Sequence, residues 1–191
     1  LGTLLAFLVC YLSMSRYKVL NWISKIYITI LRGTPMVVLL MISFYIIFAK
    51  VNIDPVLVAI IAFGLNGGAF NGEILRASIL TVDKGQIEAA RSMGFSALGA
   101  FRIVTLPQAA RVALPVYKSE FINMMKQTAV VGYISVVDLT KVGDIIRSKT
   151  FEAFFPLFVV ALIYLLTIAV FIWIFDWINK ATDKRVRRGE R

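Results

Sequence analysis

The stretch QIEAARSMG, residues 86–94, is polar and basic, and hydrophobic segments precede and follow it in the chain. Asp83 and Gln86 have the spacing of a capping box, which predicts a short helix that starts near Lys84. Gly94 is the expected end of this helix, because glycine takes the left-handed backbone conformation that other residues resist. The pattern therefore predicts a short polar helix, closed at both ends, in an otherwise hydrophobic sequence.

A second short helix is expected directly after the first. Ser96 can cap it, residues 97–104 can form it, and Pro107 is expected to stop it. Together the two helices would form a helix-turn-helix loop between two hydrophobic segments. Small residues would leave a flat surface that another protein can approach closely, and they are Ala89, Ala90, Ala97, Gly99 and Ala100.

This loop resembles the EAA loop of ABC importer permeases, in which Glu-Ala-Ala is followed by three residues, glycine, nine residues, isoleucine, one residue and Leu-Pro. The matching positions are Glu88, Ala89, Ala90, Gly94, Leu106 and Pro107, with Val104 at the isoleucine position. Because that family binds its ATPase at this loop, the resemblance implies an ATPase-docking site at residues 88–90 and at Gly94. The alternative is an ordinary cytoplasmic loop between membrane helices.

The composition is that of a membrane protein. Of the 191 residues, 59% are hydrophobic, and the mean hydropathy is +0.81. Soluble domains have roughly 45–50% apolar residues. We therefore predict an all-α integral membrane protein with a single domain, residues 1–191, whose cytoplasmic loop covers about 81–115.

Five hydrophobic segments are expected to cross the membrane, and they are residues 1–13, 36–50, 55–80, 116–137 and 154–178. Since a span needs about 20 residues, the first segment is expected to be the second half of a helix that begins before this sequence. Residues 15–32 combine basic and aromatic side chains, which is typical of the membrane–water interface.

The distribution of basic residues predicts the orientation of the chain. Most lysines and arginines fall in residues 15–32, in the loop at 81–115 and in the tail 180–191. The few in the expected outer segments are Lys50, Lys141, Arg147 and Lys149. By the positive-inside rule, the loop and the C-terminus are expected to lie in the cytoplasm. The resemblance to ABC importer permeases implies that the membrane is a bacterial cytoplasmic (inner) membrane. Asp138 and Asp144 then lie outside, as surface charges or as contacts for a binding protein.

Charge and cysteine usage exclude several classes of protein. The net charge of +10 could indicate nucleic acid, but the basic residues stand in short blocks between apolar runs, so we expect no nucleic-acid partner. Histidine is absent and Cys10 is the single cysteine, so the sequence has no disulfide framework and no zinc or haem motif. It also has no glycine-rich phosphate loop. We expect no catalytic residue, no metal site and no cofactor in this chain.

Other segments are similar to those of polar amino-acid permeases. They are Arg32-Gly33-Thr34-Pro35, the Glu-x-x-Arg segment within Asn71–Arg76, residues 84–86, residues 106–109 and Lys126-Gln127-Thr128-Ala129. The resemblance narrows the family to importers of the histidine, glutamine and arginine type. One departure is Gly68-Ala69-Phe70, where the family often has Ala-Ala-Tyr.

Four polar residues are expected near the membrane midplane, where transporters tend to hold their substrate. At ~1.5 Å per residue, Asn66 lies about 16 Å from the outer end of its span, and Lys126 and Gln127 lie about 15 Å from the inner end of theirs. A zwitterionic amino acid needs hydrogen-bond donors and acceptors. Lys126 and Thr128 can donate, and Asn66 and Gln127 can do either. We therefore predict that these four residues bind substrate; the alternative is that they only tie helices together.

Glu73 and Arg76 are three residues apart on one expected helix and can pair. Glu73 would lie near the cytoplasmic end of its span, about 10 Å deeper than Asn66. The favoured interpretation is a structural clamp close to the loop, and the alternative is a role in substrate binding.

The resemblance implies a type I ABC importer permease fold and a larger assembly. This chain would form half of a dimeric pathway with a second permease subunit, either a copy or a relative, among membrane lipids. A dimer of ATPase subunits would bind ATP and Mg²⁺, and an extracytoplasmic solute-binding protein would deliver a polar amino acid. Transport would proceed by alternating access. The other classes considered are an ATP-independent channel or secondary transporter, and a membrane-embedded enzyme, for which no nucleophile–base pair is visible.

Overall fold

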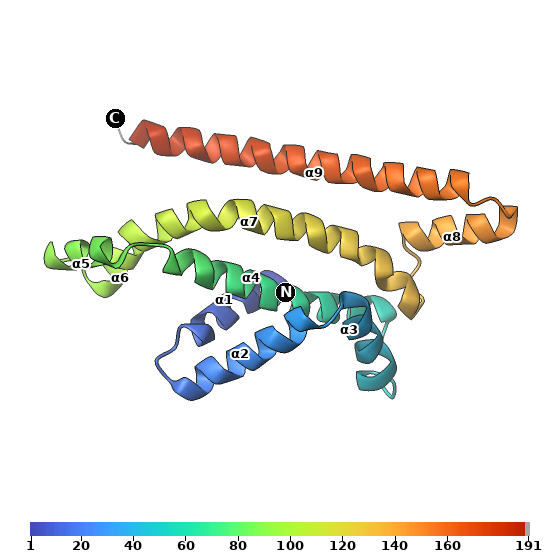
Figure 1. Ribbon diagram of the computed structural model, residues 1–191, viewed down its shortest axis with the longest axis horizontal. Coiled ribbons are helices and arrows are strands. Elements are labelled where there is room, and N and C mark those ends of the chain that lie inside the picture. Colours follow the sequence, from blue (N-terminus) through green and yellow to red (C-terminus); the bar gives the residue numbers. More distant parts are fainter. Residues whose placement is uncertain (190–191) are drawn as a thin grey trace. The chain divides into compact units, whose positions relative to one another are not determined.

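Every element that the computed structural model describes is a helix (Figure 1). The structure describes residues 1–189, with side chains through residue 177. The α-helices are α1 (Gly2–Ser13), α2 (Lys18–Gly33), α3 (Met36–Ile42), α4 (Pro55–Leu80), α5 (Lys84–Ser92), α6 (Ala97–Ala100), α7 (Leu106–Gln127), α8 (Leu139–Thr150) and α9 (Phe154–Gly189). Two π-helical segments, η1 (Ser43–Ile47) and η2 (Phe101–Thr105), and a 3₁₀ helix, η3 (Thr128–Ile134), complete the list. The all-α prediction is confirmed.

The chain divides into two units, Leu1–Glu120 and Phe121–Arg191, and α7 passes from the first to the second. Each unit is described by itself below. The organisation as a single domain stays a prediction. The side chains of the basic tail, residues 180–191, lie outside the described ones, so the predicted role of the tail in orientation also stays a prediction.

In the first unit, α1 packs along α4 at close range. A Cβ atom built on Gly72 of α4 would stand 2.7 Å from Cγ1 of Val9, and one built on Gly68 would stand 2.7 Å from Cβ of Leu5. Only a hydrogen atom fits at these two positions. The two helix backbones therefore approach closely, as small residues allow in membrane proteins.

We expect Gly72→Ala to destabilise the subunit, because the added methyl group would overlap Val9 of α1. Overpacking of this kind costs about 1–3 kcal/mol. Gly33→Ala is the matched control, since nothing lies within 4 Å of a Cβ atom built there. Thermal unfolding of the detergent-solubilised protein measures both variants, and equal midpoints would contradict the close packing of α1 on α4.

Two hydrogen bonds attach α2 to the middle of α4. The hydroxyl of Tyr27 donates to the carbonyl oxygen of Leu65 over 2.6 Å. Nδ2 of Asn66 donates to the carbonyl oxygen of Leu31 over 2.9 Å. The last turns of α2 are therefore fixed against α4.

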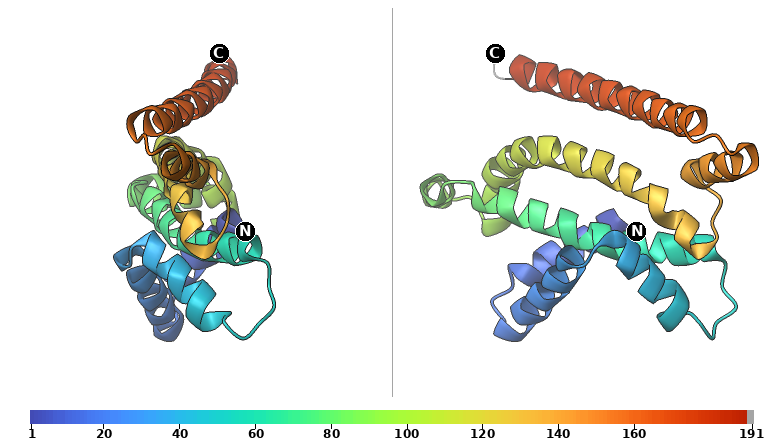
Figure 2. Two further views of the ribbon diagram at one scale, coloured as in Figure 1. Left: turned by 90° about the vertical axis from the view of Figure 1, so that its right-hand side faces the viewer. Right: turned by 45° about the vertical axis from the view of Figure 1, so that its right-hand side comes forward.

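The second predicted span, residues 36–50, is shorter in the structure, because its helix ends at Ile47. It is preceded by Thr34, which has an extended backbone (φ −108°, ψ 132°), since Pro35 disfavours a helical conformation in the residue before it. The result is a bend of 107° between α2 and the helix formed by α3 and η1 (Figure 2). The predicted interfacial segment and the second span are thus the two arms of one bent helix pair.

Two helices are long and apolar enough to cross a membrane, and they are Pro55–Leu80 and Phe154–Trp177. The bent pair of α2 with α3 and η1 is a third if it counts as one span. The apolar helix α1 has 12 residues, and α7 has 22 residues but carries several charged side chains. The third and fifth predicted spans are therefore confirmed as helices able to cross, while the total of five stays a prediction.

Pro107 does not stop the helix as predicted. The helix expected over 97–104 runs on through η2 into α7, so Pro107 lies inside a continuous helical segment, directly after the π-helical turn Phe101–Thr105. A local π-helical adjustment is one of the ways in which a helix accommodates a proline. Pro115 lies inside α7. The helix α7 therefore begins before the predicted fourth span, residues 116–137, and its α-helical part ends at Gln127; where the chain enters the membrane stays a prediction. Membrane helices tolerate internal proline when neighbouring groups compensate the lost hydrogen bond.

In the second unit, the N-terminal part of α8 packs on α9. The hydroxyl groups of Thr140 and Tyr164 lie 3.1 Å apart. The ring of Phe121, near the end of α7, contacts the rings of Phe171 and Phe175 on α9 at centroid distances of 5.7 and 5.4 Å. Aromatic contacts thus join α7 to α9, and a hydroxyl pair joins α8 to α9.

The predicted outer segment begins with a capped helix. Asp138 accepts hydrogen bonds from the backbone N–H groups of Lys141 (3.0 Å) and Thr140 (3.2 Å), so it is the N-cap of α8. Asp144 is a surface charge, and its Oδ1 lies 2.6 Å from Nη2 of Arg147. The hydrogen bond from Arg147 and the positive charge of that residue hold the pKa of the Asp144 carboxyl below its ordinary value. Asp144 therefore stays ionised at neutral pH.

Candidate functional site

Local side-chain caps fold the loop between α4 and α7. Asp83 accepts a hydrogen bond from the N–H group of Gly85 (2.5 Å) at the start of α5. Ser96 accepts one from the N–H group of Gly99 (3.0 Å) at the start of α6. Gly94 has a φ angle of +90°, in the left-handed region. Asp83 and Ser96 are thus confirmed as N-caps and Gly94 as the turn. The predicted capping box of Asp83 with Gln86 is wrong in its partner, because Asp83 binds the N–H group of Gly85 and the Gln86 side chain binds Gln108.

Gln86 braces the loop against α7, a contact that the capping-box interpretation did not include. Its Oε1 atom accepts a hydrogen bond from Nε2 of Gln108 over 2.6 Å. Across the turn, Nη1 of Arg91 donates to the carbonyl oxygen of Phe95 over 2.9 Å. Because α5 is bonded to the first turn of α7, a displacement of the loop acts directly on the helix that follows it.

The small residues of the loop divide into two groups. Glu88 and Ala89 are exposed, whereas Ala90 and Ala100 are buried inside the loop. The flat surface predicted from the small residues is therefore wrong for Ala90 and Ala100, which pack within the subunit. Among the predicted docking residues, the side chains of Glu88 and Ala89 are exposed and accessible to a partner, whereas Ala90 is buried within the loop.

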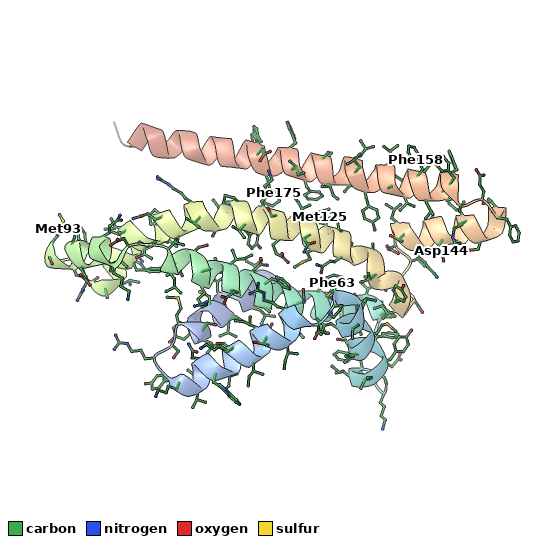
Figure 3. All side chains as sticks on the ribbon, in the orientation of Figure 1. Phe63, Met93, Met125, Asp144, Phe158 and Phe175 are labelled. Atoms are coloured by element: carbon green, nitrogen blue, oxygen red, sulfur yellow. The ribbon has the colours of Figure 1, made fainter. Side chains whose placement is uncertain are left out.

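Three large apolar side chains on the loop were missed by the sequence analysis. Met93, Leu98 and Ile103 have exposed fractions of 78%, 57% and 59%. Met93 lies at the end of the loop (Figure 3). Exposed apolar side chains at one place on a protein are typical of a contact surface. The signal was present in the sequence, as apolar residues inside a polar and basic insert.

Glu73 and Arg76 form the predicted pair on α4. Nη2 of Arg76 lies 2.6 Å from Oε1 of Glu73, and Nε lies 2.9 Å from Oε2. This is a bidentate contact, the geometry in which guanidinium and carboxylate bind most strongly. The pair is half-buried near the end of α4 that leads into the loop, and this position favours the role of a clamp.

Asn66 is 4% exposed, and its amide group donates to Leu31. Asn66 therefore ties α2 to α4. The sequence analysis had named such a structural role as the alternative to substrate binding. The substrate-binding role of Asn66 stays a prediction.

The other three predicted substrate residues lie together in the second unit, where α7 changes into the 3₁₀ helix η3. Lys126 and Thr128 are exposed in that unit, and Gln127 is half-buried between them in sequence. The hydroxyl of Thr128 donates to the carbonyl oxygen of Met125 over 2.7 Å, so its hydrogen is used within the helix. Lys126 forms no ion pair among the described side chains. A 3₁₀ segment in a long helix often marks a functional hinge, and the sequence pattern gave no sign of it.

These features define the class of protein. The helices α4 and α9 are long and apolar enough to cross a membrane, and a capped, exposed loop follows α4 and leads into α7. Within the part of the chain whose side chains are described, no group of three or more His, Cys, Asp or Glu residues could hold a metal ion. The arrangement is that of a multi-pass helical membrane subunit with an exposed surface for another protein.

Comparison with known proteins shows the family. Residues 1–188 match the family described as binding-protein-dependent transport system inner membrane component, and the chain belongs to it. The L-cystine transport system permease protein TcyB of Bacillus subtilis (strain 168) is 37% identical over 161 residues, which are 84% of this chain and 69% of that protein. A Rickettsia typhi protein that carries the name glutamine transport system permease protein GlnP is 32% identical over 190 residues, 97% of this chain and 84% of its own length.

Solved structures agree with this assignment. An amino acid ABC transporter, crystallised with histidines, matches with a TM-score of 0.84 and 35% identity over 94% of this chain and 85% of the other. The inward-facing MetNI methionine ABC transporter, 20% identical, has a TM-score of 0.70 and shares the fold. The chain is therefore the permease subunit of an amino-acid ABC transporter, with an ABC importer permease fold and no catalytic activity of its own. The resemblance found in the sequence is confirmed.

Proposed function

We propose that this permease carries a polar amino acid into a bacterial cell in an ATP-driven importer. The observation that carries the proposal is the intact coupling loop, in which two capped helices meet at a glycine with φ of +90°. The names of the similar proteins, which refer to cystine, glutamine and amino-acid transport, support an amino acid as the substrate. The C-terminus and the loop lie on the cytoplasmic side in this proposal.

The assembly consists of two permease subunits, two ATPase subunits and an extracytoplasmic solute-binding protein. The ATPase docks on the loop through Glu88 and Ala89, with Met93, Leu98 and Ile103 as additional apolar contacts. The exposed fractions of these three side chains support their role, because the buried centre of a protein contact is usually apolar. ATP and Mg²⁺ are bound by the ATPase, and this chain needs no cofactor.

Transport follows alternating access. Closure of the ATPase dimer moves the loops, and the bond between Gln86 and Gln108 passes this movement into α7. The same helix ends at the junction with η3, where Lys126, Gln127 and Thr128 lie. We propose that these residues bind the amino acid, and that movement of α7 changes the side from which they are accessible. Asn66, in the first unit, stays a separate predicted substrate residue.

Reconstitution tests the proposal. The permease is purified with its ATPase from the native membrane, its partners and bound ligand are identified by mass spectrometry, and the complex is placed in proteoliposomes with the binding protein. We expect uptake of at least one of four radiolabelled amino acids, which are glutamine, cystine, arginine and histidine. This uptake should require ATP on the side of the vesicle membrane that the ATPase subunits face. Uptake without ATP, or without any ATPase partner, would favour a channel or secondary transporter. Absence of uptake of every amino acid would reject the substrate class.

A further inference from the structure

A cleft of about 510 Å³ opens in the Leu1–Glu120 unit, between the end of α2, one face of α4 and α7. Its charged walls are Arg32 from α2, Glu73 from α4 and Glu120 from α7, and its apolar walls include Phe70 and Val116. Small-molecule sites commonly have volumes of about 300–1,000 Å³ and combine apolar walls with a few polar groups. The size and lining of this cleft therefore suit a small ligand with charges of both signs.

The position of Arg32 is fixed by the residues around it. The carbonyl oxygen of the preceding residue, Leu31, accepts the hydrogen bond from Asn66, and Tyr27 is bonded to α4 one turn earlier. Directly after Arg32 the chain leaves the helix at the 107° bend into α3 (Figure 2). Arg32 thus stands at the end of an anchored helix arm, beside α4.

The guanidinium group of Arg32 lies over the ring of Phe70, with Cζ 5.1 Å from the ring centroid. Stacking on an aromatic ring uses the flat face of the group and leaves the N–H donors at its edge. Among the described side chains, no carboxylate forms an ion pair with Arg32, whereas Arg76 is bound at two points by Glu73. Arg32 lines the cleft, and the N–H donors of its guanidinium group have the fork geometry that matches a carboxylate bound there.

An acceptor for an ammonium group stands on another wall. Glu120 of α7 is half-buried and lines the same cleft. A carboxylate has about four acceptor positions, so it can take a further hydrogen bond whatever its present partner is. A guanidinium fork and a carboxylate in one cleft present the two groups that a free α-amino acid requires.

We propose that this cleft is a further substrate position on the pathway, in which Arg32 binds the α-carboxylate of the transported amino acid and Glu120 accepts from its ammonium group. The inference rests on the proposed function and adds residues that lie apart from the Lys126–Thr128 group. Phe70 holds the plane of the guanidinium group, and Asn66 is a positioning residue that acts through Leu31. A contact that only ties α2 to α4 would not distinguish an amino acid from its carboxamide, and the experiment uses this difference.

The test measures binding to the permease–ATPase complex in nanodiscs without the solute-binding protein, so that this protein does not contribute its own selectivity. The probes are radiolabelled glutamine, arginine and cystine, and the competitors are their α-carboxamides, which lack the carboxylate charge. We expect Arg32→Gln to weaken binding of the amino acid by about tenfold or more. Competition by the carboxamide should be unchanged. Lys25→Gln removes a charge two helical turns earlier on α2 and should leave both affinities unchanged.

Equal loss of affinity for acid and carboxamide, or no loss for either, would overturn the role of Arg32. If Arg32→Gln fails to assemble, Arg32→Lys decides, because it keeps the charge but loses the planar fork. Arg32→Lys should weaken binding of the acid selectively, and native affinity in that variant would overturn the inference. The two proposals fail in different ways. No uptake by the native transporter rejects the proposed function together with this site, whereas normal uptake with native binding in the Arg32 variants rejects this site alone.

Discussion

Gly94→Val is expected to separate the permease from its ATPase. Gly94 has a φ angle of +90°, a backbone conformation that a β-branched residue resists, and a strained residue of this kind costs about 1–3 kcal/mol. Nothing lies within 4 Å of a Cβ atom built at this position. The effect of valine would therefore come from the backbone alone, through a changed turn between α5 and α6.

The expected result is loss of ATPase co-purification by about tenfold or more, since 1.4 kcal/mol corresponds to a factor of ten. Gly94→Asn is the matched control, because asparagine tolerates the left-handed region and should keep most of the complex. The measurement is the ratio of ATPase to permease after purification, together with substrate-stimulated ATP hydrolysis. Full assembly and activity of Gly94→Val would show that the geometry of this turn does not matter for docking.

The loop could be predicted from the sequence because its determinants are local. Asp83, Ser96 and Gly94 each act on backbone groups within three residues of themselves, so spacing alone identified them. Burial could not be predicted in the same way. Ala90 and Ala100 read as surface residues because they are small, and only the packing of the two short helices shows that they are buried.

The predicted helix boundaries differ from the structure where a rule about a single proline was applied within a longer helix. Pro107 was expected to stop a helix, yet α7 contains both Pro107 and Pro115. A proline rule considers one lost hydrogen bond, whereas a helix of 22 residues is stabilised along its whole length. At Thr34 and Pro35 the sequence correctly predicts a boundary between two segments. It does not predict the angle of 107° between them, because that angle depends on the contacts of α2 with α4.

The candidate substrate residues show what spacing can and cannot indicate. The three-residue separation of Glu73 and Arg76 was sufficient to predict their ion pair. The partner of Asn66, the carbonyl group of Leu31, comes from another helix and is invisible in the sequence. Likewise the change from α-helix to 3₁₀ helix after Gln127 follows no pattern of residue types. The sequence analysis grouped the four candidate substrate residues by their expected depth in the membrane. The hydrogen bonds of these residues depend on the tertiary structure.

Lys126→Met is expected to abolish most uptake while leaving the complex intact. Lys126 is exposed in its unit and has no ion pair among the described side chains. Lys126 lies in the last turn of α7, at the junction with η3. The sequence predicts that this part of the chain lies within the membrane, where a lysine charge is costly unless a carboxylate, carbonyl groups or water compensates it, and a transported amino acid supplies a carboxylate. Because hydrogen bonds to charged groups contribute about 1.5–3 kcal/mol, uptake should fall by about tenfold or more. Methionine keeps the length and apolar bulk of the side chain and removes only the charge.

Two measurements distinguish this role from a structural one. Complex yield and thermal stability in detergent report assembly, and uptake into proteoliposomes reports transport. If Lys126 bound substrate, Lys126→Met would keep yield, stability and basal ATP hydrolysis and lose uptake. If it were instead paired permanently with a carboxylate, its removal would leave a buried charge unpaired and assembly would suffer as well. Lys25→Met makes the same change at an exposed lysine on α2 and should retain uptake. Normal uptake by Lys126→Met would reject the substrate role.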